Sequence, residues 1–117
     1  MYKDLKIWNS SILLIKKVYI YADKLPKSEE YNLKSQLKRA IISVSLNIAE
    51  GKDRKTARDF AHFLNIASAS LAEVEGILLI CQELDFFKID ENILLEIETL
   101  DKMINSLYKK LIEKSAS

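Results

Sequence analysis

Apolar residues recur in steps of three and four along four long stretches of the chain, and this spacing limits the fold more than any other feature. Residues spaced in this way fall on one face of an α-helix. Three short breaks, "KLPKS", "EGKDRKT" and "DFFKIDEN", separate the four stretches. The sequence therefore predicts four helices, over residues 4–24, 29–51, 56–86 and 90–114.

The predicted core consists of the residues that these steps select. They are Leu5, Trp8, Ile12, Ile15, Tyr19 and Ala22; Leu33, Leu37, Ile41, Val44 and Ile48; Phe60, Leu64, Ala67, Leu71, Val74 and Leu78; and Ile93, Ile97, Leu100, Ile104, Leu107 and Leu111. Two glycines and one proline are too few for the many turns of a sandwich or barrel. Short connections place consecutive helices antiparallel, so we expect an all-α, up-down-up-down antiparallel four-helix bundle that forms one domain over residues 1–117.

The breaks contain residues that start and stop helices. Proline cannot continue a helix, glycine often follows the last turn, and short polar side chains accept hydrogen bonds from the first turn. The sequence predicts that Pro26 ends the first helix, Ser28 caps the second and Gly51 terminates it, Thr56 with Asp59 forms a capping box, and Asp90 caps the fourth.

Residues 60–81 form a long apolar run that raises the question of a membrane span. Glu73 and Glu75 interrupt this run, and each acid at mid-bilayer would cost about 2.5–3.5 kcal/mol. We therefore expect no membrane association but a buried helix of a soluble, cytoplasmic protein. Cys81 is the single cysteine, which excludes an internal disulfide, so we expect an inert buried thiol.

No arrangement of residues indicates an enzyme. The single histidine, His62, has no evident nucleophile or second metal ligand at a suitable spacing. Glu73 and Glu75 do not form the Glu-x-x-His motif of dimetal bundles, and neither glycine lies in a phosphate-binding loop. We expect no catalytic residues, no metal, no cofactor and no small-molecule substrate.

The second and third predicted helices each carry apolar residues outside the predicted core. These are Ile42, Leu46 and Ala49 on one helix and Phe63, Ile66, Ile77 and Ile80 on the other. A monomeric bundle leaves one face of each helix in water, so these extra apolar residues predict self-association through helices 2 and 3.

A polar stripe runs along the second predicted helix: Gln36, Arg39, Ser43, Asn47 and Glu50, spaced three or four residues apart. One interpretation is a structural network between helices or subunits, in which Arg39 pairs with a desolvated Glu73. The other is a surface that contacts a ligand or RNA. The stripe carries both signs of charge, which favours the structural interpretation.

The segments "DLKIW", "VYIYADKLP", "QLKRAIISVSLNIAEGKDR" and "FAHFLNIASASLAEVE" resemble the family of 23S rRNA intervening-sequence proteins, some of which are called ribosomal proteins. The Asn-Ile-Ala-Glu-Gly signature is complete at residues 47–51. The matching polar positions are Gln36, Arg39, Ser43, Asn47, Glu50, Gly51, Ser70 and Glu73. Ala69 departs from the pattern, because the family often has glycine before this serine.

The resemblance implies a small bacterial, cytoplasmic bundle without established enzymatic activity. It also implies a ring-like homo-oligomer, a pentamer in related proteins. A more distant resemblance is to the accessory protein of diversity-generating retroelements, which works with a reverse transcriptase and nucleic acid.

The charges of the predicted bundle are unevenly distributed, although the net charge is only +1. One end carries nine cations and five acids; the other carries seven acids and three cations. Helix dipoles favour acids at helix starts and lysines at helix ends, but Lys55 and Arg58 lie at the start of the third helix, against its dipole. The residues predicted to bind nucleic acid at the basic end are Lys3, Lys6, Lys52, Arg54, Lys55 and Arg58.

The sequence therefore predicts a non-enzymatic homo-oligomer whose leading partner is RNA or a ribonucleoprotein. The alternative is a scaffold for a protein partner, such as a reverse transcriptase or another enzyme. An enzyme with an unrecognised site is the third alternative.

Overall fold

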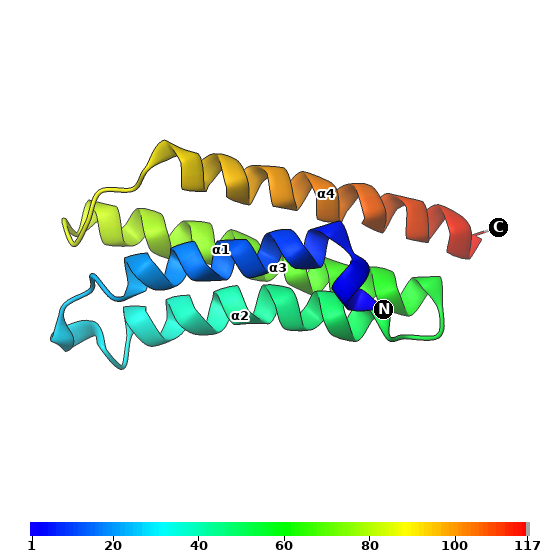
Figure 1. The fold of residues 1–117 in the computed structure, drawn as a ribbon, viewed down its shortest axis with the longest axis horizontal. Coiled ribbons are helices and arrows are strands. Elements are labelled where there is room, and N and C mark those ends of the chain that lie inside the picture. The colour runs from blue at the N-terminus through cyan, green and yellow to red at the C-terminus, as the bar shows by residue number, and fades with distance from the viewer. Residues whose placement is uncertain (117) are drawn as a thin grey trace.

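The computed structural model describes residues 1–116 and contains four long helices, α1 (Lys6–Ala22), α2 (Leu33–Lys52), α3 (Ala57–Glu83) and α4 (Glu91–Ala116). Two short 3₁₀ helices, η1 (Tyr2–Asp4) and η2 (Lys27–Glu29), lie before α1 and before α2. Figure 1 shows the long helices side by side, with the chain reversing direction at each connection. No strand occurs in the described residues, so the predicted all-α class with four helices is confirmed.

The core residues predicted on α2, α3 and α4 lie inside the molecule. Ile41, Leu64 and Ile104 have no exposed surface, and they belong to one cluster that all four helices share. Burying a side chain of this size contributes about 1.5–3 kcal/mol. Leu33, Leu107 and Leu111, toward the helix ends, are only partly buried.

The core face predicted for α1 is wrong. The buried residues of α1 are Ile7, Ser11, Leu14, Val18 and Ala22. Of the residues predicted for the core here, only Ala22 is among them, and the others are partly buried. Apolar residues surround this helix, so their spacing fits two neighbouring faces equally well. The polar Ser11 marks the buried face because its hydroxyl lies 2.6 Å from the Ser45 hydroxyl of α2. Two small residues at this crossing let α1 and α2 approach closely.

Two predicted helix ends are also wrong. Ser28 lies within η2, and α2 begins at Leu33, because the chain makes a separate 3₁₀ turn after Pro26. Gly51 does not follow the last turn of α2 but is buried within it. A Cβ atom at Gly51 would lie 2.8 Å from Cδ1 of Phe60 and 2.9 Å from Cβ of Phe63. Glycine is therefore needed here for close approach of α2 to α3.

The predicted caps of the last two helices are present. The hydroxyl of Thr56 accepts a hydrogen bond from the Asp59 amide at 3.1 Å, and the Asp90 carboxylate accepts one from the Asn92 amide at 2.9 Å. α3 ends through Asp85, whose φ of 61° lies in the left-handed region. Lys38 of α2 hydrogen-bonds to the carboxylate of Asp23, at the end of α1, and lowers the pKa of that carboxyl.

α3 is the one helix of the described chain that is long and apolar enough to cross a membrane. Nine of its residues, including Leu64, Leu71 and Leu78, are buried against the other helices. Its place in the core explains these nine residues, whereas Ile66, Leu79 and Ile80 of the same helix are exposed.

Burial raises the pKa of the Cys81 thiol, which has no exposed surface. Only the thiolate reacts with disulfide reagents, so the raised pKa and the lack of exposed surface both slow the reaction. If reaction requires opening of a core worth at least about 5 kcal/mol, Cys81 reacts about 10³-fold or more slowly in the native protein than in guanidinium. Absorbance after addition of a chromogenic disulfide reagent measures this ratio; equal rates would show that Cys81 is accessible.

Candidate nucleic-acid interface

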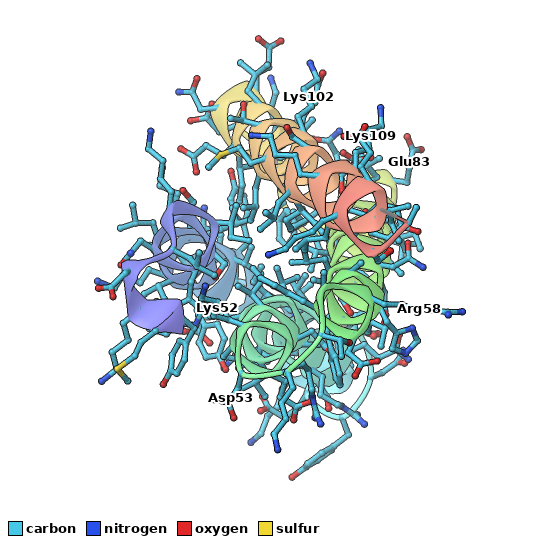
Figure 2. The ribbon with its side chains drawn as sticks, turned by 90° about the vertical axis from the view of Figure 1, so that its right-hand side faces the viewer. Lys52, Asp53, Arg58, Glu83, Lys102 and Lys109 are labelled. Atoms are coloured by element: carbon cyan, nitrogen blue, oxygen red, sulfur yellow. The ribbon has the colours of Figure 1, made fainter. Side chains whose placement is uncertain are left out.

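The predicted basic residues gather at one end of the molecule. Figure 1 shows the N-terminus, the α2–α3 connection and the C-terminal end of α4 on the same side. Figure 2 looks at this end and shows Lys52, Arg58 and Lys109 spread around it, with Asp53 on the same side as Lys52. The fold thus brings together three segments that are distant in sequence, as the sequence predicts.

Three cations around the α2–α3 connection are free to meet an external anion. Lys52, Lys55 and Arg58 are exposed, and among residues 1–116 none of them lies within ion-pair distance of a carboxylate. Their amino and guanidinium groups can therefore bind phosphate oxygens without first breaking an internal ion pair.

Arg54 is held differently from its neighbours. Its guanidinium lies 3.9 Å from the Glu50 carboxylate and 4.6 Å from the centre of the Phe63 ring. Phe63 is in turn positioned by the close approach of Gly51. Arg54 therefore extends the basic surface but is less available for a phosphate than Lys55 or Arg58.

The remaining predicted cations lie at the N-terminus. Lys3 is in η1 and Lys6 begins α1, and both are exposed. Asn9 donates from its side-chain amide to the Lys3 carbonyl at 2.9 Å, which fixes η1 against α1.

The polar stripe forms part of the predicted network. The Ser43 and Ser70 hydroxyls lie 3.0 Å apart across α2 and α3, and the Asn47 amide donates to the Ser43 carbonyl at 2.8 Å. The Ser43–Ser70 contact connects α2 to α3, and Asn47 holds Ser43 from within α2. Gln36 and Glu50 are exposed at the surface.

The predicted pairing of Arg39 with a desolvated Glu73 is wrong within one chain. Both residues are exposed, and Arg39 donates to the Ser35 hydroxyl at 3.1 Å instead. Glu73 points away from the core because Val74, its neighbour in the sequence, occupies the buried face of α3. Arg39 has no carboxylate partner among the described residues.

No arrangement in the described residues resembles a metal site, since no group of three or more potential ligands occurs there. His62 is exposed and contacts the edge of Phe63, with ring centres 5.7 Å apart. Sequence reasoning missed a groove between α1 and α4 that is lined by Leu13, Ile20 and Leu95. The signal was present as apolar residues outside the predicted core, but they were assigned no role.

A family model described as "23S rRNA-intervening sequence protein" matches residues 3–106. No curated protein matches the chain. A solved structure of a protein of unknown function, from the S23 ribosomal protein family of Bacteroides thetaiotaomicron VPI-5482, is 20% identical with a TM-score of 0.65. The alignment covers 92% of this chain and 95% of that one, and it shows that the two share a fold.

Proposed function

This chain belongs to the 23S rRNA-intervening sequence protein family, and from that premise we propose that it binds structured RNA through its basic end. The observation that carries the proposal is the set of three exposed, unpaired cations Lys52, Lys55 and Arg58 at the α2–α3 connection. Two of them, Lys55 and Arg58, lie where the dipole of α3 disfavours cations, so helix stability does not account for them.

The proposed mode of binding is recognition of the RNA backbone and shape. The α2–α3 connection, residues 53–56, contains no aromatic side chain on which bases could stack. Phosphate contacts made by lysine and arginine supply affinity that depends little on sequence. Double-stranded RNA is recognised mainly in this way, through its shape, phosphates and 2′-hydroxyls.

The protein in this proposal is a bacterial, cytoplasmic, non-enzymatic homo-oligomer. Each chain is a single up-down-up-down antiparallel domain, and the chains assemble as a ring, a pentamer by resemblance to related proteins. Exposed apolar residues support self-association: Leu46, Ile66 and Ile80 are 59%, 36% and 50% exposed. A ring of parallel chains would place the basic ends side by side and enlarge the surface that meets RNA.

Titration of structured 23S rRNA fragments at several salt concentrations tests the proposal. We expect binding that weakens with salt, with a slope of about −0.9 in log K against log salt for each phosphate contacted. Three contacts in one chain give a slope of roughly −2.7. Fluorescence anisotropy of labelled RNA measures both values.

Absence of binding at low salt would contradict the proposal. It would favour the alternative function, a scaffold for a protein partner such as a reverse transcriptase. The exposed apolar side chains of α1 and α2, Leu13, Ile20 and Leu46, are the feature of the chain that suits such a partner.

A further inference from the structure

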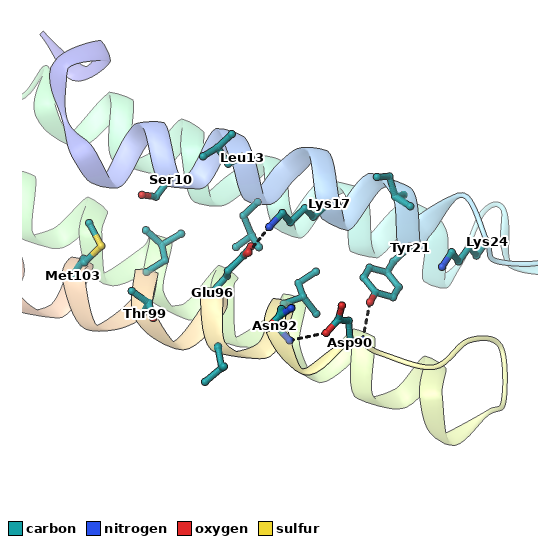
Figure 3. A pocket seen from close by; sticks show the side chains of 15 residues that line it. Ser10, Leu13, Lys17, Tyr21, Lys24, Asp90, Asn92, Glu96, Thr99 and Met103 are labelled. Carbon is teal, nitrogen blue, oxygen red and sulfur yellow. Dashed lines mark hydrogen bonds and ion pairs between the residues drawn. The ribbon is translucent and has the colours of Figure 1, made fainter.

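A groove of about 820 Å³ runs between α1 and α4. Figure 3 shows its two rims, with Leu13 and Lys17 on α1 and Glu96 and Thr99 on α4. Leu13, Ile20 and Leu95 line the groove but remain 59%, 61% and 59% exposed. Apolar residues concentrated along one groove mark a surface that another molecule covers.

Two contacts hold the rims of this groove in place. Lys17 and Glu96 form an ion pair across it, and the Tyr21 hydroxyl accepts a hydrogen bond from the Asp90 amide at 2.8 Å. The groove is therefore already shaped before anything enters it.

The same chain carries a second, different apolar surface on α2 and α3. It consists of the exposed Leu46, Ile66 and Ile80 and the half-buried Ile42 and Phe63. Figure 2 looks down the bundle and shows α1 and α4 on one side and α2 and α3 on the other. The groove and the α2–α3 surface thus lie on opposite sides of the molecule.

One part of the groove and one part of the α2–α3 surface lie at the same height along the bundle. Ser11 of α1 contacts Ser45 of α2, and the two helices run in opposite directions. Because each residue adds the same rise, Leu46 lies at the height of Ser10, one turn from Leu13, and Ile42 lies at the height of Leu14. In parallel copies, Ile42 and Leu46 therefore lie level with the Leu13 part of the groove, whereas Ile20 lies at the height of Gln36.

Arg39 supports this register. It lies six residues before Ser45, and Lys17 lies six residues after Ser11, so Arg39 reaches the height of the Lys17–Glu96 pair. Only one oxygen of Glu96 contacts Lys17, which leaves the other free to accept from a second cation. Arg39 of a neighbouring copy can supply this second cation, because it has no carboxylate partner among the described residues of its own chain.

We propose that the α1–α4 groove of one copy takes up the α2–α3 surface of the next copy, head to tail. The inference rests on the homo-oligomer of the proposed function and names its two contacting surfaces. A groove facing a second groove would leave a void at the contact, whereas a helix surface fills it at the packing density of proteins. Contacts between unlike surfaces repeat around the assembly and close into a ring when the rotation permits.

Two variants, each with one damaged surface, test the arrangement. Leu13→Glu places a charge in the groove, and Leu46→Glu places one on the α2–α3 surface. Both side chains are 59% exposed, so each variant should keep the helical content and melting behaviour of a folded chain. If Leu13→Glu unfolds the protein, Ile20→Glu damages the same groove.

Light scattering should show an oligomer for the parent and a monomer for each variant alone. Mixing the two variants should restore one contact, because one variant retains an intact groove and the other an intact α2–α3 surface. The expected product is a dimer containing one copy of each, which native mass spectrometry resolves. The control Ile112→Glu, at a residue that is 39% exposed and outside both surfaces, should assemble like the parent.

The outcomes separate the two proposals. A monomeric parent would overturn both the proposed oligomer and this contact. An oligomeric parent whose variants still assemble alone, or yield only monomers when mixed, would overturn the head-to-tail contact and leave the oligomer standing.

Discussion

Gly51→Ala should destabilise the protein by about 1–2 kcal/mol, although alanine favours helices over glycine. The new methyl group would lie 2.8 Å from the Phe60 ring and 2.9 Å from Cβ of Phe63. Overpacking of this kind costs about 1–3 kcal/mol, because Cβ of Phe63 is fixed to its own helix backbone. The higher helix propensity of alanine offsets up to about 1 kcal/mol of that cost. Urea unfolding followed by circular dichroism measures the difference.

Gly76→Ala is the matched control, since it makes the same change inside α3. Apart from its own helix backbone and its two chain neighbours, no atom lies within 4 Å of a Cβ at Gly76, so the gain in helix propensity meets no clash. We expect stabilisation of about 0.5–1 kcal/mol. Opposite signs for the two variants support close packing at Gly51; equal stabilisation of both would contradict it.

Gly51 also gives a physical reason for part of the Asn-Ile-Ala-Glu-Gly signature. Its missing side chain lets Phe63 approach α2, and the Phe63 ring supports the guanidinium of Arg54. A larger residue at position 51 would therefore move both the α2–α3 connection and the basic surface next to it. Close packing and the candidate interface depend on the same glycine.

Sequence periodicity predicted the core where a helix has a clear polar side. On α2, polar and charged residues flank the line from Leu37 to Ile48 and separate it from the second apolar group, so the core face was clearly bounded. On α1, apolar residues occur at nearly every angle, and the buried line was chosen by Ser11 meeting Ser45. Spacing within one helix contains no information about which small residues meet across two helices.

The candidate sites show the same limit of predictions made from the spacing within single helices. The grouping of cations at one end followed from helix directions, which short connections determine. The Arg39–Glu73 pairing within one chain failed because it required a distance between side chains on two helices, and the rotation of each helix about its axis sets that distance. The α1–α4 groove depends on how far those helices separate, and no pattern within either helix reports that separation.

Reversing two cations at the basic end should weaken RNA binding on the order of 50-fold at 0.1 M salt. The change is Lys55→Glu together with Arg58→Glu, both exposed and without a carboxylate partner in the described chain. Each phosphate contact adds about 0.9 to log K for every tenfold dilution of salt below 1 M. Loss of two contacts therefore lowers log K at 0.1 M salt by about 1.8, which corresponds to this factor. Arg54 is left unchanged, because its contacts with Glu50 and Phe63 would confound a loss of binding with a change in the fold.

The matched control reverses two exposed cations, Lys27→Glu and Lys88→Glu, at the opposite end of the bundle. Both double variants change the net charge equally, so a difference between them reports position and not total charge. The bundle is 50 Å long, and screening at 0.1 M salt acts over about 10 Å, so the distant pair should leave affinity and salt slope unchanged. The slope of the Lys55/Arg58 variant should fall by about 1.8 relative to the parent. Equal losses in the two variants would mean that RNA responds only to net charge, and loss in the control alone would move the binding surface to the other end.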